Sequence, residues 1–165
     1  MQRNEIEKIF DQQASSYDQQ WQKLAPLRDT LHLLMAAVFA DLPEDANVLC
    51  IGVGTGSEMF SLAQRFPGWH FTAVEPSSGM LAVCRQRAEE LGMVGRCTFH
   101  EGYLESLPVA QSFHCATALL VSQFLLEREA RTDFFRAIAQ RLHPGGILVS
   151  SDLSADIQSD AYADM

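Results

Sequence analysis

A glycine-rich stretch, VLCIGVGTGSE, is the first part of the sequence whose residue types suggest chemistry. Gly52, Gly54 and Gly56 alternate in it, directly after a short apolar run and before a segment of helical character. Glycine accepts positive φ values and lets the backbone approach a ligand closely. The free N–H groups at the start of the next helix favour an anionic group such as a carboxylate. The stretch therefore predicts a ligand-binding loop, although a tight strand-to-helix turn would need the same glycines.

A carboxylate follows this loop at a spacing typical of nucleoside sites. Glu75 ends the next apolar run, roughly twenty residues on, where an acid commonly accepts hydrogen bonds from ribose hydroxyls. The alternative is a solvated acid at a strand end. A dinucleotide fingerprint needs glycine at its sixth position, whereas here Gly56 is fifth and Ser57 is sixth. The pattern therefore favours a nucleoside cofactor and disfavours a nucleotide-dependent oxidoreductase.

Apolar runs that alternate with helical segments must position these residues. Two helices are predicted first, at 4–14 and 27–40, and the second has Leu27, Leu31, Leu34 and Val38 on one face. Predicted strands follow at 47–51, 69–75, 96–101, 113–120 and 147–151, with predicted helices at 57–66, 77–91 and 127–141. This order predicts an α/β fold, a Rossmann-like and mostly parallel sheet with helices on both faces, preceded by N-terminal helices. Ligands of such sheets bind beyond the carboxyl ends of the strands.

The chain divides into three predicted parts. Residues 1–41 form an N-terminal helical cap, residues 42–153 an α/β core and residues 154–165 a polar tail. The sequence ends soon after the last predicted strand, which leaves that edge of the sheet without a further partner. Because an open edge pairs readily with other strands, we expect self-association into a homo-oligomer through this edge.

Charge and composition limit the partners of the chain. Its 165 residues carry a formal net charge of −9, and an acidic protein is repelled by phosphate backbones. No apolar run is long enough to span a bilayer, and the polar N-terminus is no secretory signal. The four cysteines lack CxxC spacing, and no histidine sits at zinc-ligand spacing beside them, so reduced, buried thiols are expected rather than a metal site. These features predict a cytoplasmic protein with a small-molecule substrate, without nucleic-acid or membrane partners.

Several stretches together resemble a known family. GVGTG, VEPSSGML, EGYLESLP and LHPGGILVSSDL resemble, in order, the successive motifs of class I S-adenosylmethionine-dependent methyltransferases of small-molecule type. The upstream FDQQASSYDQQW is similar to the segment that precedes the fold in many members. The resemblance implies a methyltransferase that uses S-adenosylmethionine and releases S-adenosylhomocysteine. Compared with the family, the chain lacks the last strands of the fold.

The resemblance also implies roles for individual residues. The three glycines would hold the methionine end of the cofactor, and Glu75 would bind the ribose hydroxyls. Tyr17 would close over the cofactor, and its ring or that of Trp21 would lie near the cationic sulfonium. The backbone of Leu119 would meet the methionine amino group. The adenine would lie among residues of the second and third motifs, namely Pro76, Met80, Gly102, Tyr103 and Leu104.

Three positions depart from the family pattern. Cys50 stands where an Asp or Glu often ends the first strand, and Tyr103 stands where an Asp often follows the glycine of the third motif. His114 stands where an Asp often opens the fourth strand, at the end of the strand away from the site. A thiol cannot replace the charge of a carboxylate, and loss of a buried acceptor typically costs about 1–3 kcal/mol. These departures predict weaker cofactor binding.

The substrate side of the predicted site contains few groups suited to acid–base chemistry. Tyr17, Trp21, Ser122 and Gln123 are expected to face the open end of the sheet. His32 is expected to be a packed or surface histidine, and no catalytic residue is assigned. The leading hypothesis is methyl transfer to an unidentified small molecule. The alternative is a catalytically inactive or incomplete protein of this fold with a binding or regulatory role.

Overall fold

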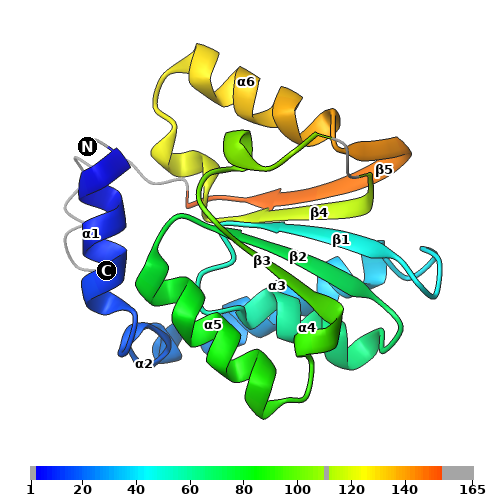
Figure 1. Ribbon diagram of the computed structural model, residues 1–165, viewed down its shortest axis with the longest axis horizontal. Helices are drawn as coiled ribbons and strands as arrows, with labels where there is room; N and C mark the ends of the chain where they lie inside the picture. Colours follow the sequence, from blue (N-terminus) through cyan, green and yellow to red (C-terminus); the bar gives the residue numbers. More distant parts are fainter. Residues whose placement is uncertain (1–2, 110–111, 154–165) are drawn as a thin grey trace.

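A five-stranded sheet organises the chain in the computed structural model, which describes residues 3–109 and 112–153 (Figure 1). Its order is β3-β2-β1-β4-β5 and every neighbouring pair is parallel. The strands are β1 (Asn47–Ile51), β2 (His70–Glu75), β3 (Cys97–Glu101), β4 (Phe113–Leu119) and β5 (Leu142–Ser151). The predicted α/β fold with a parallel sheet is confirmed. The predicted polar tail at 154–165 lies outside the described residues.

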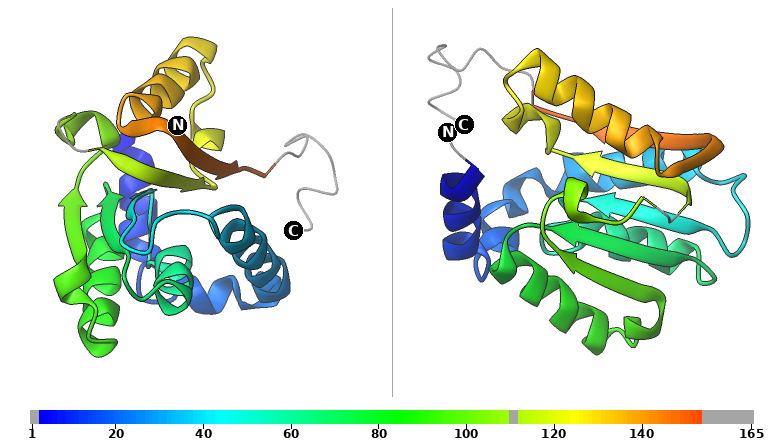
Figure 2. Two further views of the ribbon diagram at one scale, coloured as in Figure 1. Left: turned by 90° about the vertical axis from the view of Figure 1, so that its right-hand side faces the viewer. Right: turned by 45° about the horizontal axis from the view of Figure 1, so that its top comes forward.

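Helices cover both faces of this sheet (Figure 2). The longer helices are α1 (Arg3–Gln13), α3 (Ala25–Val38), α4 (Ser57–Arg65), α5 (Ser78–Glu90) and α6 (Arg128–Ala139). The short ones are α2 (Tyr17–Gln20) and the 3-10 turns η1 (Gln22–Leu24), η2 (Val94–Arg96), η3 (Leu104–Ser106) and η4 (Ser122–Phe124). α3, α4 and α5 share one apolar core cluster with the sheet, and α6 shares a second cluster on the other face.

The residues of β1 show why both faces must be covered. Val48 and Cys50 point into the cluster beneath α3, α4 and α5, whereas Leu49 and Ile51 point into the cluster beneath α6. All four are at most 3% exposed. Side chains of a strand alternate between faces, and a central parallel strand is therefore apolar throughout. This burial fixes β1 in the middle of the sheet, with the glycine loop directly at its carboxyl end.

Two sequence expectations about the fold are corrected. The apolar face predicted for the second helix is mainly exposed, since Leu27, Leu34 and Val38 are 64%, 59% and 54% exposed. The face of α3 that packs on the sheet instead contains Met35 and Ala36. The last strand begins at Leu142 rather than at 147, because a register shift opposite Phe113–Cys115 lets HPGG remain in the strand.

Of the N-terminal helices, α1 and α2 lie at the carboxyl ends of the strands, on the left of Figure 1, whereas α3 packs on one face of the sheet. Asp11 of α1 fixes this position, because its carboxylate accepts hydrogen bonds from the Ser77 hydroxyl at 2.6 Å and from the Gly79 N–H at 2.9 Å. These bonds lower the pKa of Asp11 and place its negative charge at the N-terminus of α5, where the helix dipole stabilises it. At the opposite end of the sheet, the Nδ1 atom of His114 accepts from the Asn47 N–H at 2.9 Å, a structural role.

No helix within residues 3–109 and 112–153 combines the length and apolar character that a membrane span requires.

Candidate functional site

A cavity of about 340 Å³ lies between the carboxyl ends of the strands and the N-terminal helices. Its volume falls within the range of small-molecule sites. Ten of the eleven predicted cofactor residues line it, and only Gly56 does not. The ten are Tyr17, Gly52, Gly54, Glu75, Pro76, Met80, Gly102, Tyr103, Leu104 and Leu119. The fold therefore brings residues from both ends of the sequence to one cavity.

Glu75 connects β2 to the glycine loop. Its Oε2 atom accepts a hydrogen bond from the Gly54 N–H, and its Oε1 atom accepts one from the Ser77 N–H, both at 2.9 Å. The residue is 6% exposed, and burial raises the pKa of its carboxyl group although the two N–H donors oppose the shift. A carboxylate oxygen has about two acceptor positions, so each oxygen retains one for a ligand hydroxyl.

The glycines of the loop have different surroundings. Gly54 has φ +55° and lines the cavity, and a Cβ atom built there meets nothing within 4 Å. Gly56 has φ +88°, and a Cβ atom there would collide with the Phe60 ring and lie 2.8 Å from the Cys84 sulfur. Gly54 thus leaves open space at the cavity wall, whereas Gly56 is required for packing at the start of α4.

Alanine substitutions are expected to separate these two roles. Gly54→Ala adds a methyl group toward open space, so we expect it to destabilise the fold by only about 1–2 kcal/mol, the strain of positive φ. Gly56→Ala adds a collision to similar strain, and we expect a loss of about 3–5 kcal/mol. Urea unfolding measures both. Equal losses for the two variants would contradict the assignment of Gly56 to packing.

The wall opposite the glycine loop combines apolar and charged groups. Met80 and Leu104 are 1% and 3% exposed. The guanidinium of Arg3 lies 4.4 Å from the centre of the Tyr103 ring and forms an ion pair of 2.8 Å with Glu105. Burial is the largest cause that raises the pKa of Tyr103, and Glu7 adds to it. α1 therefore closes this wall through contacts with residues that follow β3.

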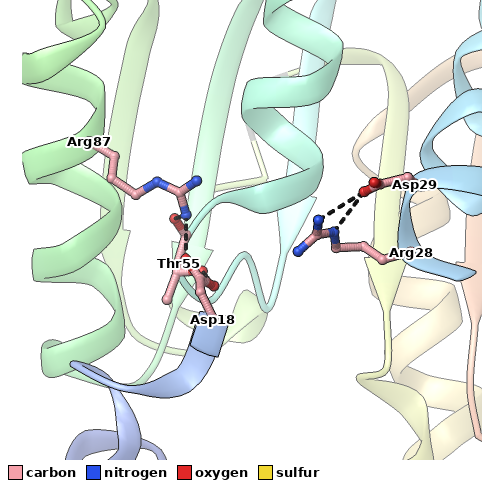
Figure 3. A network of polar contacts seen from close by, with 5 residues as sticks. All are labelled: Asp18, Arg28, Asp29, Thr55 and Arg87. Carbon is pink, nitrogen blue, oxygen red and sulfur yellow. Dashed lines mark hydrogen bonds and ion pairs between the residues drawn. The ribbon is translucent and has the colours of Figure 1, made fainter. Parts of the chain in front are cut away.

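A second network closes the cavity from α2 (Figure 3). Asp18 accepts a hydrogen bond from the Thr55 hydroxyl at 2.7 Å and pairs with Arg87 of α5 at 2.8 Å. Arg87 also donates to the backbone oxygen of Thr55 at 3.2 Å. These contacts fasten α2 to the glycine loop and hold Tyr17 above it. The carboxylate of Asp18 is therefore held in this network.

Tyr17 contributes a neutral ring to the cavity. Burial is the largest cause that raises the pKa of its phenol to about 12, and Glu58, Glu75 and Asp18 add to the shift. The ring lies 6.0 Å from that of Trp21 and 6.1 Å from that of Phe10, between ring centres. Tyr17 therefore stays protonated at ordinary pH and offers an aromatic face rather than a base.

Two polar residues that the sequence analysis did not assign also line the cavity. Glu58, in the first turn of α4, is 7% exposed, and burial raises the pKa of its carboxyl group to about 8. His32 of α3 is 7% exposed, and burial and the charge of Arg28 lower the pKa of its imidazole. Glu58 ends the glycine-rich stretch VLCIGVGTGSE, and this position is the sequence feature that could have identified it as a cavity residue. No sequence signal separates His32 from an ordinary buried histidine.

Ser122 and Gln123, predicted to face the open end of the sheet, do not line the cavity. The Ser122 hydroxyl donates to the carboxylate of Asp152, and the side-chain oxygen of Gln123 accepts from the Leu153 N–H at 2.9 Å. Both side chains therefore hold the segment after β5. Val121 and Phe124, their neighbours in the chain, line the cavity instead.

Comparison with known proteins gives three kinds of similarity. Residues 48–146 match the model of a family described as methyltransferase domain. The erythromycin 3''-O-methyltransferase of Saccharopolyspora erythraea is 33% identical over 116 residues, which are 69% of this chain and 37% of that protein. The chain thus spans well under half of this curated relative.

Two solved structures have a similar fold. One is an amino pentose methyltransferase of Micromonospora echinaspora with S-adenosylmethionine bound, with a TM-score of 0.63 and 27% identity. This match covers 76% of the present chain and 50% of the other. The other is the cyclase SpnF, with a TM-score of 0.66 and 29% identity over 75% of this chain and 44% of that chain.

Proposed function

The chain belongs to the methyltransferase domain family, and we propose that it transfers the methyl group of S-adenosylmethionine to a small molecule. The observation that carries the proposal is the position of Glu75, whose buried carboxylate borders the cavity beside the open space at Gly54. A nucleoside needs an acceptor for its ribose hydroxyls and a loop that its tail can approach. This cavity offers both, so the residues present fit the cofactor.

Each cavity residue then has a role in holding the cofactor. Glu75 accepts hydrogen bonds from the ribose hydroxyls, and Gly52 and Gly54 approach the methionine end. The backbone of Leu119 would lie beside the amino group. The adenine would lie among Pro76, Met80, Gly102, Tyr103 and Leu104, and Tyr17 would close over the cofactor.

The proposed reaction depends mainly on positioning. S-adenosylmethionine supplies an electrophilic methyl group on a cationic sulfonium. Tyr17, held by the Asp18–Thr55–Arg87 network, presents a ring that stabilises a nearby cation by about 0.5–2 kcal/mol. Orientation of two reactants can contribute roughly 7–11 kcal/mol in favourable cases. Because its pKa is lowered, the imidazole of His32 is neutral. It can therefore take up the proton that the small-molecule substrate loses on methylation.

The acceptor is expected to be small and partly apolar. One side of the cavity is lined by residues of α3, η1, η4 and α6, including Leu27, Leu31, Phe124 and Phe134. The two methyltransferase relatives carry names that refer to erythromycin and to an amino pentose. These names support a small-molecule acceptor here, and the chemistry of this wall favours one with an apolar body.

The alternative is a protein that binds the cofactor without methyl transfer. The similarity to a cyclase supports it, because a fold does not determine a reaction. The test is the formation of S-adenosylhomocysteine when the protein is incubated with S-adenosylmethionine and a panel of hydroxyl and amine acceptors. Product that depends on an acceptor supports methyl transfer. Tight cofactor binding with no product across the panel supports the alternative.

Self-association and a cytoplasmic location stay predictions. β5 is an edge of the sheet within the described residues, and the outer face of α3 exposes Leu27, Leu34 and Val38. An open strand edge and an apolar helix face both favour contact with a second copy. Gel filtration at high concentration is expected to give a dimer or larger species. A clean monomer would contradict this expectation.

A further inference from the structure

Glu58 has an unusual position for a carboxylate. It lies in the first turn of α4, two residues after Gly56, and borders the cavity although it is only 7% exposed. Within residues 3–109 and 112–153, no ion pair involves Glu58. Burial of an unpaired carboxylate is costly. A sequence that retains one at a cavity wall therefore indicates a ligand of opposite charge.

The ionisable groups that interact electrostatically with Glu58 are acids, and its own backbone N–H opposes the rise of its pKa. Glu75 of β2, Tyr17 of α2, Cys50 of β1 and Cys84 of α5 each interact electrostatically with it. Desolvation is the largest cause that raises the pKa of Glu58 to about 8, and Glu75 adds to it. A cation in the cavity would reverse both effects, because it would replace lost hydration and screen the neighbouring acid.

Cys50 explains why this carboxylate is needed. Cys50 is 0% exposed, belongs to the apolar core and does not line the cavity. The family pattern often has an acid at this position, and here it supplies no charge. Glu58 lies near enough to Cys50 to raise the pKa of its thiol, although burial is the largest cause of that rise. Glu58 is the first acidic residue after Cys50 in the sequence.

We propose that Glu58 binds the ammonium group of the methionine part of S-adenosylmethionine, in place of the acid that is absent at Cys50. The proposal rests on the proposed function, because it assigns a partner within the same cofactor site. Apart from the sulfonium, the ammonium is the cationic group that the tail of the cofactor brings. An ion pair there would satisfy the buried carboxylate and fix the tail along the glycine loop.

Two ligands separate this role from general support of the site. S-adenosylhomocysteine carries the ammonium, whereas methylthioadenosine has the same nucleoside and a thioether but no amino-acid tail. Calorimetric titration of both is compared for the wild type, Glu58→Gln and the control Glu129→Gln. Glu129 is exposed on α6, so its substitution removes one negative charge away from the cavity.

Glu58→Gln is expected to lower the affinity for S-adenosylhomocysteine by about 10- to 100-fold, the usual effect of losing a charged hydrogen-bond partner. Its affinity for methylthioadenosine should stay within about twofold, which also shows that the variant is folded. Unchanged affinity for S-adenosylhomocysteine would overturn the proposal. So would an equal loss for both ligands, because Glu58 would then support the loop rather than the ammonium. A wild type that binds neither ligand would instead overturn the proposed function.

The pH dependence of binding gives a second readout. Below about pH 8 Glu58 is largely protonated, so pairing with an ammonium must release its proton. We expect the affinity of the wild type for S-adenosylhomocysteine to rise between about pH 6 and pH 7.5, before the amino group of the ligand begins to deprotonate. Tyr17 and Cys84, each with pKa about 12, stay protonated in this range.

Methylthioadenosine again provides the reference, because Glu75 contacts the ribose of both ligands and its titration affects both. The extra proton release seen only with S-adenosylhomocysteine should vanish in Glu58→Gln. Calorimetry in two buffers of different ionisation enthalpy measures it. The same proton release in the variant as in the wild type would contradict the role of Glu58.

Discussion

Glu75→Ala is expected to weaken S-adenosylmethionine binding by at least about 100-fold. The substitution removes the proposed acceptor of the ribose hydroxyls, and a hydrogen bond to a charged group contributes about 1.5–3 kcal/mol. Two such bonds correspond to roughly 3–6 kcal/mol, or more than two powers of ten in affinity. It also removes the acceptor of the Gly54 N–H, so the glycine loop loses its connection to β2. Calorimetric titration of the folded variant measures the loss.

Glu101→Ala is the matched control for this prediction. Glu101 ends β3 in register with Glu75, but it is exposed and does not line the cavity. Its substitution should leave the affinity within about twofold of the wild type. If Glu75→Ala remained folded and bound S-adenosylmethionine as tightly as Glu101→Ala, the ribose site would have to lie elsewhere.

Glu58→Gln is expected to stabilise the protein without ligand at alkaline pH. Burial raises the folded pKa of Glu58 from its ordinary value of 4.5 to about 8, so the folded protein holds this proton more tightly than the unfolded chain. This contribution to stability is fully present below about pH 4.5 and is lost as the pH rises through about 8. At about pH 8.5 the wild type carries an ionised, unpaired and buried carboxylate, which glutamine removes.

The size of the effect follows from the pKa difference. A shift of this order corresponds to roughly 2–4 kcal/mol of unfolding free energy after allowance for relaxation of the site. Urea unfolding with reductant is measured at about pH 5 and about pH 8.5. The unfolding free energy of Glu58→Gln relative to the wild type should increase from the lower to the higher pH. The corresponding difference for Glu129→Gln should not change with pH. A pH-independent difference would contradict a raised pKa at Glu58.

The fold was largely predictable because the strands carry a strong local signal. Residues 47–51 were predicted as a strand and form β1 with the same bounds, since four apolar residues follow Asn47 between two turn-like segments. The last strand was predicted five residues too short, because Pro144 and Gly145 usually end regular structure. The bulge that keeps them in β5 depends on pairing with β4, which a local pattern cannot reveal.

Helix faces and cavity walls were less predictable. Leu27, Leu34 and Val38 form a regular apolar stripe, whereas the face of α3 that packs on the sheet contains Met35 and Ala36. Only tertiary packing decides which face of the helix is buried. The glycine motif predicted the loop, but it could not show that Gly56 packs against Phe60 while Gly54 borders the cavity. Motif spacing likewise did not reveal Glu58, whose burial results from the way α4 starts behind the loop.

Calorimetric titration of the wild-type chain with S-adenosylmethionine and S-adenosylhomocysteine tests most directly the proposal that this cavity binds S-adenosylmethionine. The geometry of Glu75, Gly54 and Glu58 predicts saturable binding of both ligands at one site per chain, with dissociation constants in the micromolar range, corresponding to about −8 kcal/mol. An absence of heat and of competition at millimolar ligand, from protein shown to be folded, would contradict the claim.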